Sequence, residues 1–408
     1  MRFLSTHKRG RKRLSRCRVA AFEVAAFEKV PTGLLKAIAA AFGILSLPGC
    51  IEQVDDAADF AKSQCRRAPL IDVATGAPII GAEDIALDPD SSRLIISAYD
   101  RRAVEQAARQ RAFLLPEGGV YAVSLADLMT ADGRLVGATP LIAPNQASGG
   151  LRPHGLDYDA TLNEVVFVNR GYQKINGRWH MTPRVERLSL AGEAPDVAAD
   201  APISAIDAPC SANDIVGAGK DTLVTYDHSL CGWRAMIEDV FNLKRSGIVR
   251  PDDSALLFKG LSYANGLARL SEHKYAIAAT RENAIVFVEE RLGIMAKGEK
   301  LQESVRVELP GGPDNLTMSA DGDIIAALHP SLLWIGAHRK LGIERAPSRI
   351  VAIDPDNGKV SLLYEDLRGD QFSAATVGVR TGNMLIAGSV SEPGLLVCQT
   401  SQTLGEES

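Results

Sequence analysis

The chain has 408 residues, of which 46% are hydrophobic and 23% are charged, the balance of a soluble globular protein. Its net charge of -5 argues against a nucleic-acid partner, because a surface that binds phosphates needs an excess of basic residues. The length exceeds that of a typical single domain, but closed β architectures of this size can form one unit.

The beginning of the chain is predicted to be a targeting segment. A basic stretch precedes an apolar run from Leu34 to Leu47, which is short for a membrane span but suits a signal peptide. The next residues, Leu-Pro-Gly-Cys ending at Cys50, resemble the lipobox of bacterial lipoproteins, in which the cysteine is lipidated. We therefore expect residues 1–50 to be a leader, and the protein to be exported as a periplasmic or outer-membrane lipoprotein of a bacterium. The alternative is a plain secretory signal in which Cys50 is incidental.

Four cysteines follow this leader. An even number of cysteines in an exported chain favours disulfides, and four cysteines allow three pairings. Their spacing contains no CxxC or paired Cys/His pattern of a zinc site, so metal binding through sulfur is not expected. The four are Cys65, Cys210, Cys231 and Cys398.

A short sequence pattern recurs six times in the rest of the chain. In each copy, polar or small residues precede a hydrophobic anchor, and a turn then leads to an apolar, β-rich run. Repeats of roughly 40 to 60 residues made of short strands are typical of propeller blades. We therefore predict an all-β, six-bladed propeller over residues 65–400, between a linker at 51–64 and a tail at 401–408. A β-sandwich is the alternative. The anchors are Ile85, Leu156, Ile215, Leu267, Leu316 and Val377.

Oxygen-bearing side chains occupy the two positions before most of these anchors. Because the innermost strand of every blade begins near the same end of the central channel, equivalent positions converge. Carboxylates packed together repel one another unless a cation lies between them. Oxygen ligands with several amides favour calcium over zinc or copper, with magnesium as the alternative. Asp and Asn also mark turns before strands. The side chains are those of Glu83, Asp84, Asn213, Asp214, Asn265, Asp314 and Asn315.

One histidine, His154, lies two positions before its anchor, Leu156, and so is equivalent in the repeat to Glu83 before Ile85. Calcium can polarise a carbonyl while a neighbouring imidazole activates water near neutral pH. We therefore expect His154 to be catalytic, with a structural, hydrogen-bonding histidine as the alternative.

Six short motifs surround these positions. They are Gly-Ala-Glu-Asp at 81–84, Pro-His-Gly-Leu at 153–156, Ala-Asn-Asp-Ile-Val at 212–216, Tyr-Ala-Asn-Gly at 263–266, Asp-Asn-Leu at 314–316 and Ala-Leu-His-Pro at 327–330. In this order they resemble the paraoxonase/arylesterase family of calcium-dependent lactonases, over the whole stretch from about Cys65 to Cys398.

The resemblance implies two calcium ions, and it assigns roles residue by residue. His154 would be the general base. Cys65 and Cys398 would join the first and last strands of the ring, which leaves Cys210 with Cys231. The catalytic ion would be held by Glu83, Asn213, Asn265, Asp314 and Asn315. The structural ion would be held by Asp84, Asp214 and the carbonyl of Leu156, and the substrate pocket would include Asp227, His228 and His329.

One position departs from the family pattern. The family pairs its base histidine with a second histidine in an Asn-His context, where this chain has Asn169-Arg170. An arginine cannot relay a proton at neutral pH. Either His154 has another partner, or the substrate is an anionic ester or lactone that Arg170 binds. A solvated Arg170 is the third possibility.

Together these features predict a calcium-dependent hydrolase of small lactones or aryl esters. The alternative is a non-hydrolytic calcium-binding propeller, either a binding module or a lyase or synthase of similar shape. Loops at 101–116, 170–184 and 331–347 are expected to set specificity. We expect no nucleic-acid partner, and contact with a membrane only through the lipid anchor.

Overall fold

The computed structural model describes residues 51, 54, 56–142, 147, 149–190, 203–217, 219–290, 300–343 and 345–400. The chain divides into two units, residues 1–55 and 56–408, and the described sheets belong to the second. The predicted leader with Cys50 and the predicted tail at 401–408 lie outside the described residues.

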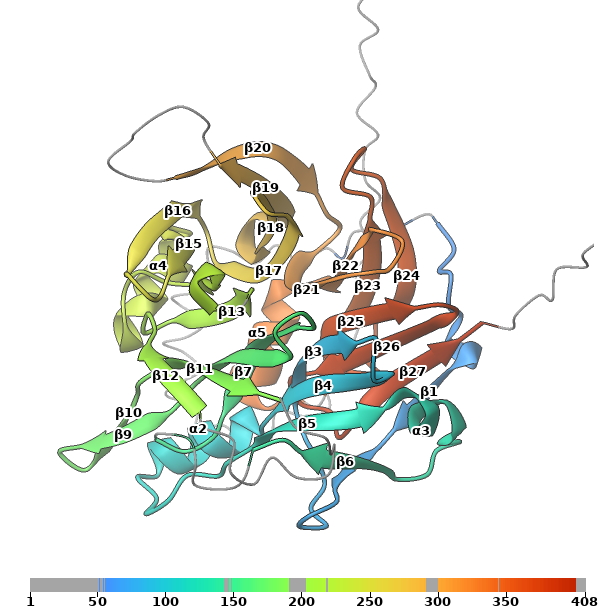
Figure 1. Cartoon of the computed structure of the whole chain (residues 1–408), viewed down its shortest axis with the longest axis horizontal. Helices are drawn as coiled ribbons and strands as arrows, with labels where there is room; N and C mark the ends of the chain where they lie inside the picture. Colours follow the sequence, from blue (N-terminus) through green and yellow to red (C-terminus); the bar gives the residue numbers. More distant parts are fainter. Residues whose placement is uncertain are drawn as a thin grey trace, which may run out of the picture. The chain divides into compact units, whose positions relative to one another are not determined.

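Six antiparallel sheets follow one another along the chain, which confirms the predicted six-bladed β-propeller (Figure 1). Their inner strands are β3 (Ala82–Asp88), β7 (Pro153–Asp159), β13 (Ala212–Val216), β17 (Ala264–Ser271), β21 (Gly312–Met318) and β25 (Ala375–Thr381). Each inner strand contacts the next, and β25 contacts β3, so that the ring is closed. Each predicted hydrophobic anchor lies in one of these strands.

Three or more outer strands complete each blade. Blade 1 adds β4 (Arg93–Ala98), β5 (Gly119–Ser124), β6 (Val136–Pro140) and the parallel edge strand β2 (Leu70–Asp72), and blade 2 adds β8 (Glu164–Asn169), β11 (Arg184–Ser189) and β12 (Ile203–Asp207). Blade 3 adds β14 (Leu223–Tyr226), β15 (Ser246–Arg250) and β16 (Ala255–Leu261), and blade 4 adds β18 (Lys274–Ala279), β19 (Ala284–Glu290) and β20 (Leu301–Glu308). Blade 5 adds β22 (Ile324–His329), β23 (Ser348–Ile353) and β24 (Val360–Asp366), and blade 6 adds β26 (Met384–Ser389), β27 (Leu395–Gln399) and β1 (Cys65–Ala68).

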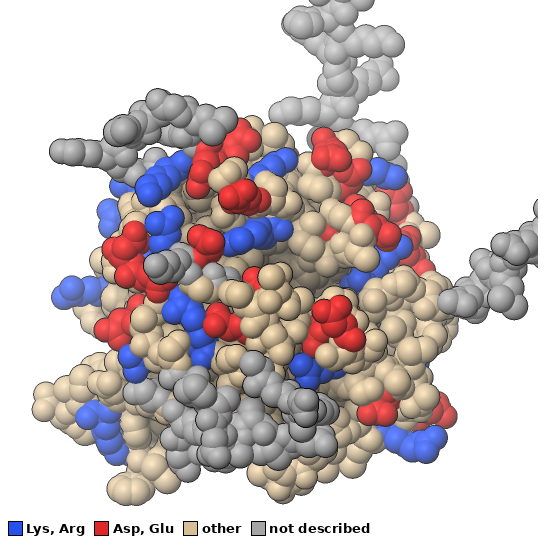
Figure 2. Space-filling view, in the orientation of Figure 1, with Lys and Arg blue, Asp and Glu red and all other residues tan. Residues whose placement is uncertain are grey.

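Helices and one hairpin lie in the connections between strands. In the described part of the chain, no helix is both long and apolar enough to cross a membrane. The hairpin is β9 (Tyr172–Ile175) with β10 (Arg178–Met181). The α-helices are α2 (Arg101–Arg109), α3 (Leu125–Thr130), α4 (Ala235–Phe241) and α5 (Leu332–Leu341), and the 3-10 helices are η1 (Lys62–Gln64), η2 (Gly219–Asp221), η3 (Gly232–Arg234) and η4 (Thr280–Glu282). On the face in Figure 2, basic and acidic side chains are interspersed.

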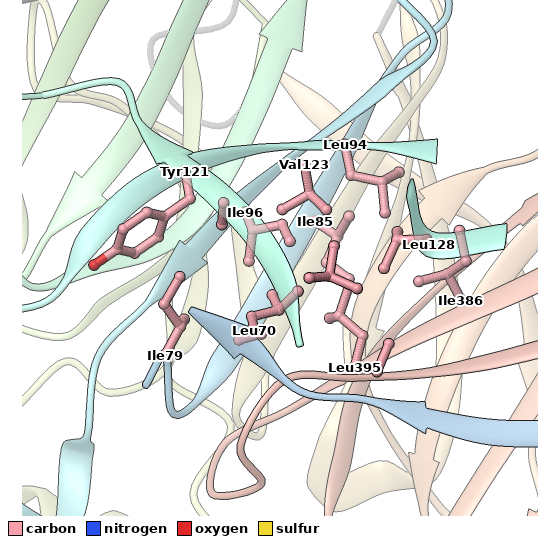
Figure 3. Close-up of a cluster of buried hydrophobic side chains, with 14 of the residues drawn as sticks. Leu70, Ile79, Ile85, Leu94, Ile96, Tyr121, Val123, Leu128, Ile386 and Leu395 are labelled. Atoms are coloured by element: carbon pink, nitrogen blue, oxygen red, sulfur yellow. The ribbon is translucent and has the colours of Figure 1, made fainter. Parts of the chain in front are cut away.

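The core lies between neighbouring blades. The second strand of each blade, counted from the channel, is rich in apolar residues because neighbouring blades cover both of its faces. In blade 5 this strand, β22, is buried along its whole length. Figure 3 shows the junction of blades 1 and 6, where Ile85 and Leu94 pack with Ile386 and Leu395. Full burial of such a side chain contributes about 1.5–3 kcal/mol, so these junctions hold the ring rigid around its channel.

The ring is closed by the N-terminal strand, which pairs with the last strand of blade 6. Cys65 lies opposite Cys398 in the register of β1 and β27, and the two form a disulfide across a sequence separation of 333 residues. This confirms the predicted closure. A second disulfide joins Cys210 to Cys231, as predicted.

Residues just before Cys65 also pack on the propeller. The Phe60 side chain is buried, and its amide donates to the carbonyl of Leu363 in β24 at 2.9 Å. The Asp59 amide donates to the neighbouring carbonyl of Leu362. Asp59 and Phe60, in the predicted linker, therefore pack against the outer strand of blade 5.

Candidate active site

A cavity of about 390 Å³ opens where the six inner strands begin. The connections predicted to set specificity supply its walls: α2, the β9–β10 hairpin and α5 all contribute side chains. Arg102 of α2 donates to the carbonyl of His338 in α5 at 3.0 Å, so these two helices are in contact. Every blade contributes at least one residue of its inner strand to the cavity, namely Glu83, His154, Asn213, Asn265, Asp314 and Thr376. The volume is that of a pocket for a small molecule.

Three of the predicted calcium ligands are asparagines with unpartnered oxygens. The Oδ1 atoms of Asn213, Asn265 and Asn315 are buried and accept no hydrogen bond. Each amide nitrogen is engaged: Asn213 donates to Asp227 at 3.1 Å, Asn265 donates to Asp314, and Asn315 donates to the carbonyl of Glu83 at 2.9 Å. A buried polar atom without a partner is rare and needs an explanation.

A calcium ion would supply that explanation, and the residues present fit it. Calcium takes six to eight oxygen ligands, including amide and carboxylate oxygens. The carboxylates of Glu83 and Asp314 lie with Asn213 and Asn265 at the same cavity. The described residues contain no group of three or more His, Cys, Asp or Glu arranged for a metal.

The predicted ligands of the structural ion have protein partners in this structure. Asp84 accepts from the amides of Ile85 at 2.9 Å and of Leu156 at 2.8 Å, in the next blade. Burial raises the pKa of Asp84, and the charge of Asp214 raises it further. A carboxylate has about four lone-pair sites, so these bonds leave room for a cation. The second ion therefore stays a prediction.

Asp214 repeats the arrangement of Asp84 two blades further on. It accepts from its neighbour Ile215 at 2.8 Å and, across the blade junction, from the amide of Leu267 at 2.6 Å. Both carboxylates thus join the start of one inner strand to the next blade. Sequence comparison of the six copies aligns these residues but cannot show their partners, because each partner is a main-chain amide.

His154 is buried between a carboxylate and a guanidinium group. Its Nδ1 contacts Oε2 of Glu83, and both ring nitrogens lie 3.1 Å from Nη2 of Arg101. Burial and then the charge of Arg170 lower the pKa of His154 to about 3. Burial raises the pKa of Glu83, but His154, Arg101 and Arg170 outweigh it and lower that pKa to about 2. At neutral pH the pair is therefore an ionised glutamate beside a neutral imidazole.

The predicted pocket residues Asp227, His228 and His329 all line the cavity. His228 lies between two carboxylates, with Nδ1 2.6 Å from Asp227 and Nε2 3.1 Å from Asp239. Burial lowers its pKa, but these carboxylates outweigh burial and raise the pKa to about 10. His228 is therefore a cation at neutral pH and cannot act there as a base.

His329 and Asp314 form a second histidine–carboxylate contact at the cavity. Nε2 of His329 lies 2.8 Å from Oδ2 of Asp314, while its Nδ1 is buried without a hydrogen-bond partner. The arrangement fixes the imidazole beside a predicted calcium ligand.

Arg170 is buried at the cavity wall, so the solvated alternative is wrong. Arg101, by contrast, gives no sequence signal for a role in the site. It lies outside the six-fold repeat at the start of α2, and its Nε donates to the hydroxyl of Tyr99 at 3.2 Å. Tyr263 likewise lines the cavity and packs its ring edge-on against His228.

No protein-family model and no curated protein matches the sequence. Solved structures match along most of the chain. A luciferin-regenerating enzyme is 11% identical, with a TM-score of 0.47, over 83% of this chain and 95% of that one. The calcium-binding protein regucalcin from Agrobacterium tumefaciens is 14% identical, with a TM-score of 0.40, over 81% and 95%. The periplasmic gluconolactonase of Pseudomonas aeruginosa is 10% identical, with a TM-score of 0.41, over 79% and 88%. Likeness at this level identifies no substrate for this chain, and the resemblance to paraoxonases stays a prediction.

Proposed function

We propose that this protein is a calcium-dependent hydrolase of small lactones or aryl esters. The observation that carries the proposal is the pair of unpartnered amide oxygens on Asn213 and Asn265, beside the carboxylates of Glu83 and Asp314 at one cavity. A third unpartnered amide oxygen belongs to Asn315, which donates to the carbonyl of Glu83. A calcium ion held by them would polarise a substrate carbonyl and stabilise negative charge on its oxygen.

The protein's own groups would position water and substrate. His154 is neutral, and its contact with Glu83 through Nδ1 leaves Nε2 as the nitrogen that can accept a proton from water. Arg101 lies at 3.1 Å from that nitrogen, so it must release Nε2 before the proton moves. Ionised Glu83 would then stabilise the imidazolium that forms.

The test is a panel of lactones and aryl esters assayed with purified protein, with and without a calcium chelator. The proposal expects hydrolysis of at least one compound, lost on chelation and restored by added calcium. Hydrolysis that is indifferent to the chelator would reject the calcium requirement.

A second candidate is a calcium-binding module without hydrolytic activity. Two observations favour it: both ring nitrogens of His154 have close partners, and Arg170 stands where the resembling family has a second histidine. A panel without turnover, together with tight calcium binding, would select this candidate.

We also propose export to an oxidising compartment such as the periplasm. The two disulfides support it, since such bonds form and persist outside reducing compartments. Lipidation at Cys50 can be tested by mass spectrometry of the mature N-terminus.

A further inference from the structure

Arg170 is a buried cation that faces the cavity with part of its guanidinium group unused. It follows β8 directly and is 8% exposed. Its Nη2 donates to the carbonyl of Ala212 in blade 3 at 3.2 Å, whereas its buried Nε has no hydrogen-bond partner. A buried charge without an ion-pair partner is costly, and a guanidinium group often binds a carboxylate through two parallel N–H donors.

The described part of the cavity offers Arg170 no carboxylate within ion-pair distance. Each carboxylate nearby is already engaged by another group. Asp227 contacts His228 at 2.6 Å, Asp239 contacts His228 at 3.1 Å and Arg281 at 3.3 Å, Asp314 contacts His329 at 2.8 Å, and Glu83 contacts His154 and Arg101.

A second guanidinium group, that of Arg101, lines the same cavity. Among the described residues Arg101 makes an ion pair with Glu83 at 3.8 Å, which is at the same time a proposed calcium ligand, and it also interacts electrostatically with Glu105. A calcium ion at this site would offset the negative charge of Glu83. Less negative charge would then remain to balance the positive charges of Arg101 and Arg170. A negatively charged group on a molecule that enters the cavity would compensate them.

We propose that the substrate is a small ester or lactone that carries a carboxylate, and that Arg170 binds this carboxylate. The inference rests on the proposed function for the ester or lactone part, but not for the carboxylate. A guanidinium edge offers two parallel N–H donors that match the two oxygens of a carboxylate. On this proposal Arg170 selects the substrate. It does not relay a proton, because an arginine stays protonated at neutral pH.

A pair of substrates that differ only in this charge tests the proposal. Mono(4-nitrophenyl) terephthalate carries a free carboxylate that the ring holds too far from the ester to attack it, and its methyl ester is the neutral partner. In both reactions water adds its hydroxyl to the acyl carbon, its proton passes to the base and then to solvent, and the C–O bond to nitrophenolate breaks. We expect wild-type protein to favour the charged substrate in kcat/KM by about 10- to 100-fold, the range of a charge-assisted hydrogen bond. An equal or reversed preference overturns the proposal without any variant.

Two variants distinguish a loss of carboxylate binding from a general loss of activity. Arg170→Gln should remove the preference, with a loss of about 10- to 100-fold on the charged substrate and less than threefold on the neutral one. Arg184→Gln, in β11 of the same blade and outside the cavity lining, should leave both rates unchanged. An Arg170→Gln protein that loses both activities equally contradicts the role in carboxylate binding.

Binding of glutarate, measured by isothermal titration calorimetry, makes the test independent of hydrolysis. We expect binding to wild-type protein that weakens about 10-fold or more in Arg170→Gln and is unchanged in Arg184→Gln. If neither ester is hydrolysed but glutarate binds in this way, the proposed hydrolysis fails while carboxylate recognition stands. If glutarate does not bind, or binds both variants equally, the carboxylate proposal is wrong.

Discussion

Arg101 holds its Nη2 atom 3.1 Å from both ring nitrogens of His154. The contact places a permanent cation against the imidazole that is proposed to take a proton from water. Burial lowers the pKa of His154 most, the charge of Arg170 lowers it next, and the charge of Arg101 lowers it as well. The two arginines therefore contribute to the pH range in which this histidine can act.

Substitution Arg101→Gln should move the acidic limb of the pH–rate profile to higher pH. Loss of the cation lets the pKa of His154 rise from about 3, while burial and the charge of Arg170, which are the larger causes, still hold it below its ordinary value of 6.5. The profile of kcat/KM against pH, measured for wild type and variant, checks this. Exposed Arg178→Gln in the β9–β10 hairpin is the matched control. An acidic limb that stays in place would show that His154 does not control the rate.

Substitution His154→Gln tests the base directly. We expect a loss of about 10²- to 10⁴-fold in kcat, with unchanged folding and calcium affinity, because a general base contributes rate and not binding. Circular dichroism and calcium titration are the controls. Turnover at the wild-type rate would move the role of base to another group, such as His329.

The fold could be predicted from the sequence because each blade contains a complete copy of the repeated pattern. Each copy has its own hydrophobic anchor, as Ile85 is in β3, and equivalent positions of the six copies meet at the central channel of a closed ring. The same register brought Glu83 and Asn265 to one cavity. Arg101 could not be found in this way, because its place depends on how α2 packs over the channel. The amide partners of Asp84 and Asp214 also escape prediction, since they arise only when neighbouring blades pack.

His228 should make stability depend on pH on the alkaline side. Its folded-state pKa is raised to about 10 from an ordinary 6.5, so its contribution is complete below about pH 6.5 and is lost as pH rises through about 10. The melting temperature of wild type should therefore exceed that of His228→Gln most below pH 6.5, and the difference should shrink by pH 10. A difference that is constant across this range would contradict the buried ion pair with Asp227.

The disulfide that closes the ring should matter more than the second one. Replacing Cys65 and Cys398 by serine should lower the free energy of unfolding by about 2–5 kcal/mol, because this bond restrains the longer unfolded loop. Its sequence separation is 333 residues, against 21 for Cys210 and Cys231. Denaturant unfolding of the two double variants gives the comparison. A larger loss from the pair at 210 and 231 would argue against ring closure as the stabilising element.

Calcium titration of the hydrolysis rate, in wild type and in Asn265→Ala, tests the central claim most directly. The Asn265 Oδ1 atom is buried without a partner, so the substitution should remove a calcium ligand, together with the hydrogen bond that the amide donates to Asp314. We predict a saturable dependence on free calcium, with a midpoint at least 10-fold higher in the variant and a rate partly restored at high calcium. A wild-type rate that does not change between chelator and saturating calcium would contradict a calcium-dependent hydrolase.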